Sequence, residues 1–87
     1  MIMLKKIRNY FAVASFVNKI RKELKGGNYS TDTAKVQAAL EAIIKHKDTL
    51  PQCLRDKPEY DYVMQILQDV LDLDVVSLES EVKAMLG

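Results

Sequence analysis

The feature that most constrains the fold is a set of apolar residues at helical spacing near the start of the chain. They follow the i, i+3, i+4, i+7 rule and are Ile7, Tyr10, Val13, Ala14, Val17, Ile20 and Leu24. The cations Arg8, Lys19 and Lys22 fall on the opposite face of the same helix. Residues 3–25 are therefore predicted to form one amphipathic helix, which ends at Gly26 because glycine readily adopts the left-handed conformation found at helix C-termini.

This opening stretch does not have the composition of a membrane segment. Ten uncharged residues, 9–18, separate two basic clusters, whereas a spanning helix needs about 20 apolar residues. Ala12-Val13-Ala14 resembles a signal-peptide cleavage site, but almost no apolar region precedes it. The sequence therefore predicts neither a signal peptide nor a membrane anchor. Cys53 is the single cysteine, which excludes an intramolecular disulfide, and we expect a cytoplasmic location.

A second helix is predicted over residues 31–47, with Ser30 or Asp32 as its N-cap. Its expected core face consists of Val36, Ala39, Leu40, Ile43 and Ile44. A second face carries Ala34, Ala38 and Ala42 at successive i+4 positions, and these small side chains would let another helix approach closely. Residues 48–57 are expected to be a linker, because Pro51 interrupts the helical pattern.

The last part of the chain is predicted to form helices over residues 58–73 and 75–86. Their apolar stripes stay in phase, which would allow one continuous helix, but Asp74 falls within the stripe and can cap a new helix. A break at Asp74 is therefore favoured. Nothing in the sequence alternates as a β-strand does. The expected fold is all-α: a small antiparallel bundle of three to four helices, forming one domain over residues 1–87.

The net charge of +1 conceals an uneven distribution along the 87 residues. Residues 1–47 carry a charge of +7 and residues 48–87 a charge of −6. The basic face of the first helix then has three interpretations. The first is a face that is solvated or is neutralised by the acidic half of the same chain; the second is assembly, in which the basic half of one molecule meets the acidic half of another; the third is binding of an external anion.

The residue types needed for catalysis or metal binding are scarce. His46 is the only histidine and lies seven residues before Cys53. A nucleophilic pair would require these two side chains to meet, and nothing in the sequence indicates that they do. One His and one Cys cannot supply the four ligands of a structural zinc site. Asp69, Asp72 and Asp74 lack the glycine and glutamate of a calcium-binding loop. We expect no cofactor, no metal and no small-molecule substrate.

The sequence is best interpreted as a non-enzymatic protein that acts through helix–helix association, as a homo-oligomer or as a subunit of a larger assembly. The alternative is a protein whose basic helix face binds an anionic surface, either nucleic acid or a negatively charged membrane. Candidate partner-binding residues for these functions are Arg8, Lys19, Lys22, Phe11, Phe16, Ala34, Ala38 and Ala42. Short helical chains without catalytic groups are also common in phages and mobile elements, which suggests such an origin by association alone.

Overall fold

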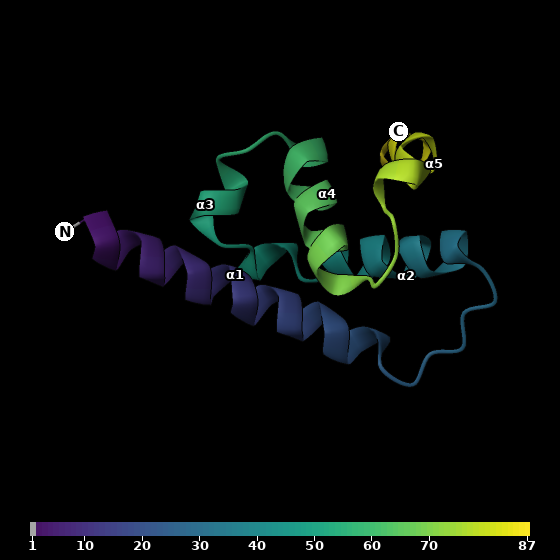
Figure 1. Cartoon of the computed structure of the whole chain (residues 1–87), viewed down its shortest axis with the longest axis horizontal. Helices are drawn as coiled ribbons and strands as arrows, with labels where there is room; N and C mark the ends of the chain where they lie inside the picture. Colours follow the sequence, from purple (N-terminus) through teal and green to yellow (C-terminus); the bar gives the residue numbers. More distant parts are fainter. Residues whose placement is uncertain (1) are drawn as a thin grey trace.

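The computed structural model describes residues 2–87, with side chains from Lys6 onward, and is all-α over that part of the chain (Figure 1). Its α-helices are α1 (Ile2–Leu24), α2 (Asp32–Lys45), α3 (Gln52–Arg55), α4 (Glu59–Val70) and α5 (Glu79–Leu86). Two short 3₁₀ helices, η1 (Lys47–Thr49) and η2 (Val76–Leu78), lie between them. The predicted all-α fold is therefore confirmed, and none of the described helices is long and apolar enough to cross a bilayer.

Helices α1 and α2 form an antiparallel pair, and α4 packs against both (Figure 1). The turn between α1 and α2 begins at Gly26, whose φ of +85° only glycine adopts readily. Both figures show α4 running across α1 at a steep angle, so the antiparallel arrangement is limited to the first two helices. Helix α5 also contacts α2.

One hydrophobic cluster joins all five α-helices. Its fully buried members include Ile20, Val36, Leu54, Ile66, Leu67, Val75 and Val82. Ile44 differs from the prediction: it was expected in the core and is 62% exposed. Ile43 is buried as expected, and Ala42 is buried on its other side, so the core-facing stripe of α2 is displaced toward Ala42 and leaves Ile44 just beyond its edge.

The second helix is capped by a residue that was not predicted. Thr31, and neither Ser30 nor Asp32, is the N-cap of α2, and its hydroxyl accepts a hydrogen bond of 3.0 Å from the amide of Ala34. This places Asp32 in the first turn, where its negative charge favours the helix dipole.

The segment predicted as a linker, residues 48–57, contains part of η1 and the whole of α3. Arg55 holds it in shape: Nε donates to the carbonyl of Leu50 at 2.9 Å, and Nη2 donates to that of Asp48 at 2.8 Å. Leu54 inserts into the core from α3. Pro51 precedes this helix, where the missing amide hydrogen costs nothing.

The break before the last helix is confirmed, although it begins earlier than Asp74. Helix α4 ends at Val70, and Leu71 has extended backbone with ψ of 138°. At Asp74 the chain turns back: the carboxylate accepts a 3.4 Å hydrogen bond from the amide of Ser77. The break buries Val75 and directs Val82 of α5 into the core. A continuous helix would have carried these residues away from α2.

Candidate functional site

The main candidate surface is the first half of α1, which extends past α3 toward the N-terminus (Figure 1). We call residues 2–12 the arm. Ile7, Tyr10 and Phe11 of the arm are 47%, 70% and 64% exposed, respectively. The core is reached only from about Val13 onward, where Phe16, Val17 and Ile20 become buried. The apolar stripe of α1 therefore continues beyond the part of it that this chain covers.

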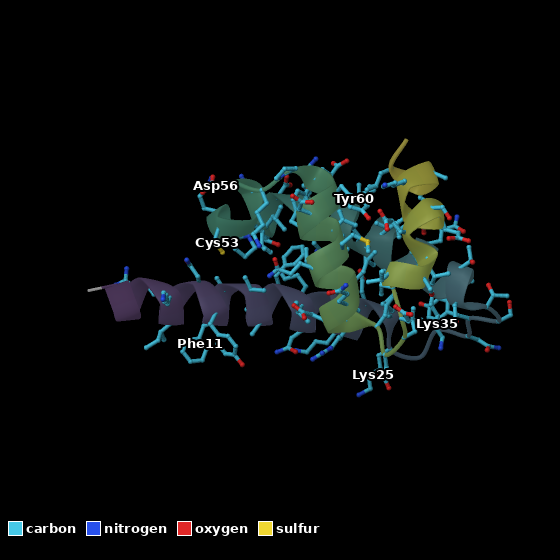
Figure 2. The ribbon with its side chains drawn as sticks, turned by 45° about the horizontal axis from the view of Figure 1, so that its top comes forward. Phe11, Lys25, Lys35, Cys53, Asp56 and Tyr60 are labelled. Atoms are coloured by element: carbon cyan, nitrogen blue, oxygen red, sulfur yellow. The ribbon has the colours of Figure 1, made fainter. Side chains whose placement is uncertain are left out.

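The arm presents apolar groups on more than one side. The rings of Tyr10 and Phe11 meet edge to face, with centroids 5.7 Å apart. Phe11 points away from α3 and Cys53, which lie on the opposite side of α1 (Figure 2). On the side facing α3, a groove of about 520 Å³ lies between the arm and the body. Tyr10 and Val13 line this groove from α1, and Cys53 and Lys57 line it from the other wall.

The predicted basic face of α1 does not act as one free surface. Arg8 lies exposed on the arm, and Lys22 lies exposed near the other end of the helix. Lys19, between them, is partly buried, and its Nζ donates a 3.0 Å hydrogen bond to Thr49 Oγ1. None of the three takes part in an ion pair among residues 6–87. The acidic half of the chain therefore does not neutralise this face through ion pairs among the described side chains.

Two of the aromatic and alanine candidates lie in the core. Phe16 is 2% exposed and Ala42 is 5% exposed, so both belong to the hydrophobic core and not to an open surface as expected, although Ala42 also lines a groove. The reason is that α4 and the end of α1 lie over the helix faces on which these residues sit. Ala34 and Ala38 are half-buried. Ala38 lines a shallow groove with Tyr29, so the alanine face of α2 is partly covered by its own chain.

The titratable side chains do not form a catalytic arrangement. Glu23 of α1 forms an ion pair with Lys45, in which Oε1 lies 2.7 Å from the Lys45 Nζ, and the same oxygen lies 3.4 Å from His46 Nε2. The hydrogen bond from Lys45, followed by that from His46, lowers the pKa of the Glu23 carboxyl. His46 thus packs beside Glu23, whereas Cys53 lines the groove beneath the arm, and that groove does not include His46. No group of three potential metal ligands occurs among the described residues.

A second group of charges joins α4 to α5. The Nζ of Lys83 lies 3.0 Å from Glu79 and 5.3 Å from the centre of the Tyr60 ring. The hydrogen bond from Lys83 lowers the pKa of Glu79, and the same bond raises the pKa of Lys83. Burial, and next the hydrogen bond to Glu79, raises the pKa of Tyr60. The contact of Lys83 with the Tyr60 ring is thus made between α5 and α4 at the surface.

The candidate functional residues that the sequence did not predict lie on the surface. Ile7 and Tyr10 were assigned to the core stripe, because periodicity alone does not say how far along a helix its own chain covers it. The cations Arg21, Lys25 and Lys35 were not recognised as one group, because only the antiparallel α1–α2 pair brings them to a common groove. Comparison with protein-family models, with curated proteins and with solved structures finds no match to this chain.

Proposed function

We propose that this chain is a non-enzymatic, cytoplasmic protein that acts by helix–helix association, as a homo-oligomer or as a subunit of a larger assembly. The observation that supports this proposal is the exposed apolar surface of the arm. Ile7, Tyr10 and Phe11 lie together on a helix that the rest of the chain does not cover. Fully burying a side chain of this size contributes about 1.5–3 kcal/mol, so a partner that covered the two rings would gain several kcal/mol.

The shape of the arm suits a helical partner. At about 1.5 Å per residue, the 23-residue helix α1 is about 34 Å long, and the molecule's longest extent is 45 Å. The arm is therefore the part of one regular helix, α1, that the rest of the protein leaves uncovered. Residues 1–22 contain six Lys or Arg and no Asp or Glu, so a partner with acidic residues around its apolar contact surface would fit best.

The proposal is tested by measuring the mass of the protein in solution with light scattering behind a sizing column. We expect an oligomer at micromolar concentration, at a multiple of 9.9 kDa. The double variant Tyr10→Ser/Phe11→Ser should shift the mass to that of the monomer while leaving the helical circular dichroism spectrum unchanged. Ile44→Ser is the matched control, because it removes an apolar side chain of similar exposure from α2. A wild-type monomer at every concentration would contradict self-association.

A second candidate function rests on the same arm. Its exposed rings lie beside the cations Lys6 and Arg8, which is the composition of a helix that binds at the surface of an anionic membrane. Ile7 and Tyr10 belong to the predicted apolar stripe of α1, and because both are exposed they are available to a membrane surface. Co-sedimentation with phosphatidylserine vesicles distinguishes the two functions. Membrane binding is favoured if the monomeric protein binds the vesicles and the variant Lys6→Glu/Arg8→Glu does not.

A further inference from the structure

A groove at the C-terminal end of α1 collects four cations from two helices. Arg21, Lys22 and Lys25 come from the last turns of α1 and the residue after it, and Lys35 comes from the start of α2. We call it the basic groove; its volume is about 490 Å³. Figure 2 shows Lys25 and Lys35 at the same end of the molecule, far from Phe11. Asp72 is the single acidic residue in its lining.

The cations of the basic groove are not neutralised by ion pairs within the described part of the chain. The ion pairs among residues 6–87 involve Lys45, His46, Lys47 and Lys83, none of which lines this groove. Arg21 donates a hydrogen bond to the carbonyl of Asp69, which fixes its guanidinium at the C-terminal end of α4. Like charges held close together create a positive potential that attracts an anion.

The other wall of the basic groove is apolar. Leu24 and Tyr29 line it from one side, and Val70 and Leu71 line it from the end of α4. The Tyr29 ring is held over the backbone of Gly27 so closely that a Cβ at that residue would lie 2.2 Å from the phenol oxygen. The ring is therefore placed by the turn itself. A volume of about 490 Å³ falls within the range of sites for small organic ligands, about 300–1,000 Å³.

We propose that the basic groove binds a nucleoside phosphate, either as a free nucleotide or as one unit of a single-stranded nucleic acid. The phosphates would lie against Lys22, Lys25 and Lys35, and the base would lie against Tyr29 and Leu71. Single-strand binding sites combine these two elements, a cationic track for phosphates and an aromatic surface for bases. A free nucleotide in this groove would be a small-molecule ligand, whereas the sequence analysis expected no small-molecule substrate.

Two other sources of phosphate fit the groove less well. A double helix is too wide to enter a half-open groove of this size, so its phosphates would meet the lysines without using the apolar wall. Exposed apolar residues beside the cations would strengthen binding to a lipid headgroup by entering the bilayer, but the exposed Ile7, Tyr10 and Phe11 lie at the opposite end of α1. This inference is independent of the association proposed for the arm, because the two surfaces share no residue.

The test is a fluorescence anisotropy titration of a short fluorescein-labelled oligothymidylate with the full chain. We expect binding that weakens as salt rises from about 50 mM to about 200 mM. Lys25→Ala/Lys35→Ala should weaken binding about tenfold and lower the salt slope by about 1.4, which corresponds to two lost contacts on a single strand. Lys6→Ala/Arg8→Ala is the matched control, since it removes the same charge from the arm, outside the basic groove. Circular dichroism checks that both variants fold.

Competition experiments separate the two sources of the ligand. Displacement of the oligonucleotide by ATP, with pyrophosphate at least tenfold weaker, supports a site for the free nucleotide. Binding of the oligonucleotide without displacement by ATP supports the strand as the source. Equal competition by pyrophosphate and ATP would show that the apolar wall is unused and would overturn the nucleoside part of the proposal. No binding, or a loss of binding with Lys6→Ala/Arg8→Ala but not with Lys25→Ala/Lys35→Ala, would overturn it altogether.

Discussion

At the scale of single residues, the two phenylalanines of α1 have opposite environments. Phe16 is buried in the hydrophobic cluster, whereas Phe11 is exposed on the arm. The two residues are five positions apart, which places their side chains about 140° apart around the helix. Phe16 therefore faces the core, whereas Phe11 points away from α3 (Figure 2). Tyr10 differs from both: it lies on the apolar stripe and is exposed because the neighbouring helices begin to cover α1 only near Val13.

Glu23 makes the stability of the protein depend on pH. Its pKa is lowered from 4.5 in the folded state by Lys45 and His46, so the ionised carboxyl stabilises the fold above pH 4.5 and this contribution is lost as pH falls through the folded-state pKa. Glu23→Gln should therefore lower the urea midpoint near neutral pH, by a small amount because the pair is exposed, and the difference should shrink in strongly acidic buffer.

The control for this prediction is Glu41→Gln. Glu41 is exposed on α2 and takes part in no ion pair among residues 6–87. It should leave the urea midpoint nearly unchanged. A loss of stability in Glu23→Gln that stayed constant from neutral to acidic pH would mean that the side chain acts through packing and not through its charge.

At the scale of the elements, side-chain hydrogen bonds lie at the ends of several helices. Thr31 caps α2, Arg55 joins η1 to α3 through Asp48, and Asp74 forms the turn before η2. Each of these bonds satisfies a backbone group that the helix itself leaves without a partner. Residues 48–57 are ordered for this reason, although their proline had indicated a linker.

Thr31→Ala tests the cap directly. Loss of the hydroxyl leaves the Ala34 amide without its partner, and the free energy of unfolding should fall by about 1 kcal/mol. Ser30→Ala is the control, because Ser30 is exposed and the cap hydrogen bond of α2 comes from Thr31. Urea denaturation followed by circular dichroism measures both. Equal losses in the two variants would mean that the cap is shared between them.

At the scale of the whole molecule, the fold converts a division of charge along the sequence into local groups. Lys47 of the basic half pairs with Glu59 of the acidic half at 3.6 Å, while Glu23 pairs with Lys45 within the basic half. The antiparallel α1–α2 pair then gathers the remaining cations near Lys35 into the basic groove. The cations that the sequence assigned to one face of α1 are thus separated: Arg8 lies on the arm, Lys19 is bonded to Thr49, and Lys22 lines the basic groove.

The small size of the core makes its central residues sensitive to substitution. Ile66 is fully buried in α4, and Ile66→Ala should lower the free energy of unfolding by about 2–5 kcal/mol. Stability of a chain of this length is about 4–13 kcal/mol, so this single change removes a large share of it. Ile44→Ala, at an exposed position, should change stability by less than about 0.5 kcal/mol. Similar values for the two variants in urea denaturation would contradict the observed core.

The sequence predicted the helices well because helix formation is encoded locally. The period of the apolar residues, Gly26 and Asp74 predicted the order of the four longer helices with errors of a few residues at their ends, but α3 lies in the segment that was predicted as a linker. The surfaces could not be predicted in the same way. The way the helices cross decides whether Tyr10 is covered and whether Lys25 and Lys35 line one groove. No single stretch of sequence determines those crossing angles.

Cys53 has a practical consequence for experiments on this protein. It is the only thiol in the chain, it is partly accessible, and it lines the groove between the arm and α3. A maleimide dye would therefore label the natural sequence at a single known place, beside Tyr10. The rate of that labelling reports how closely the arm lies against the body, and a partner that draws the arm away would quicken the reaction without any cysteine having to be engineered.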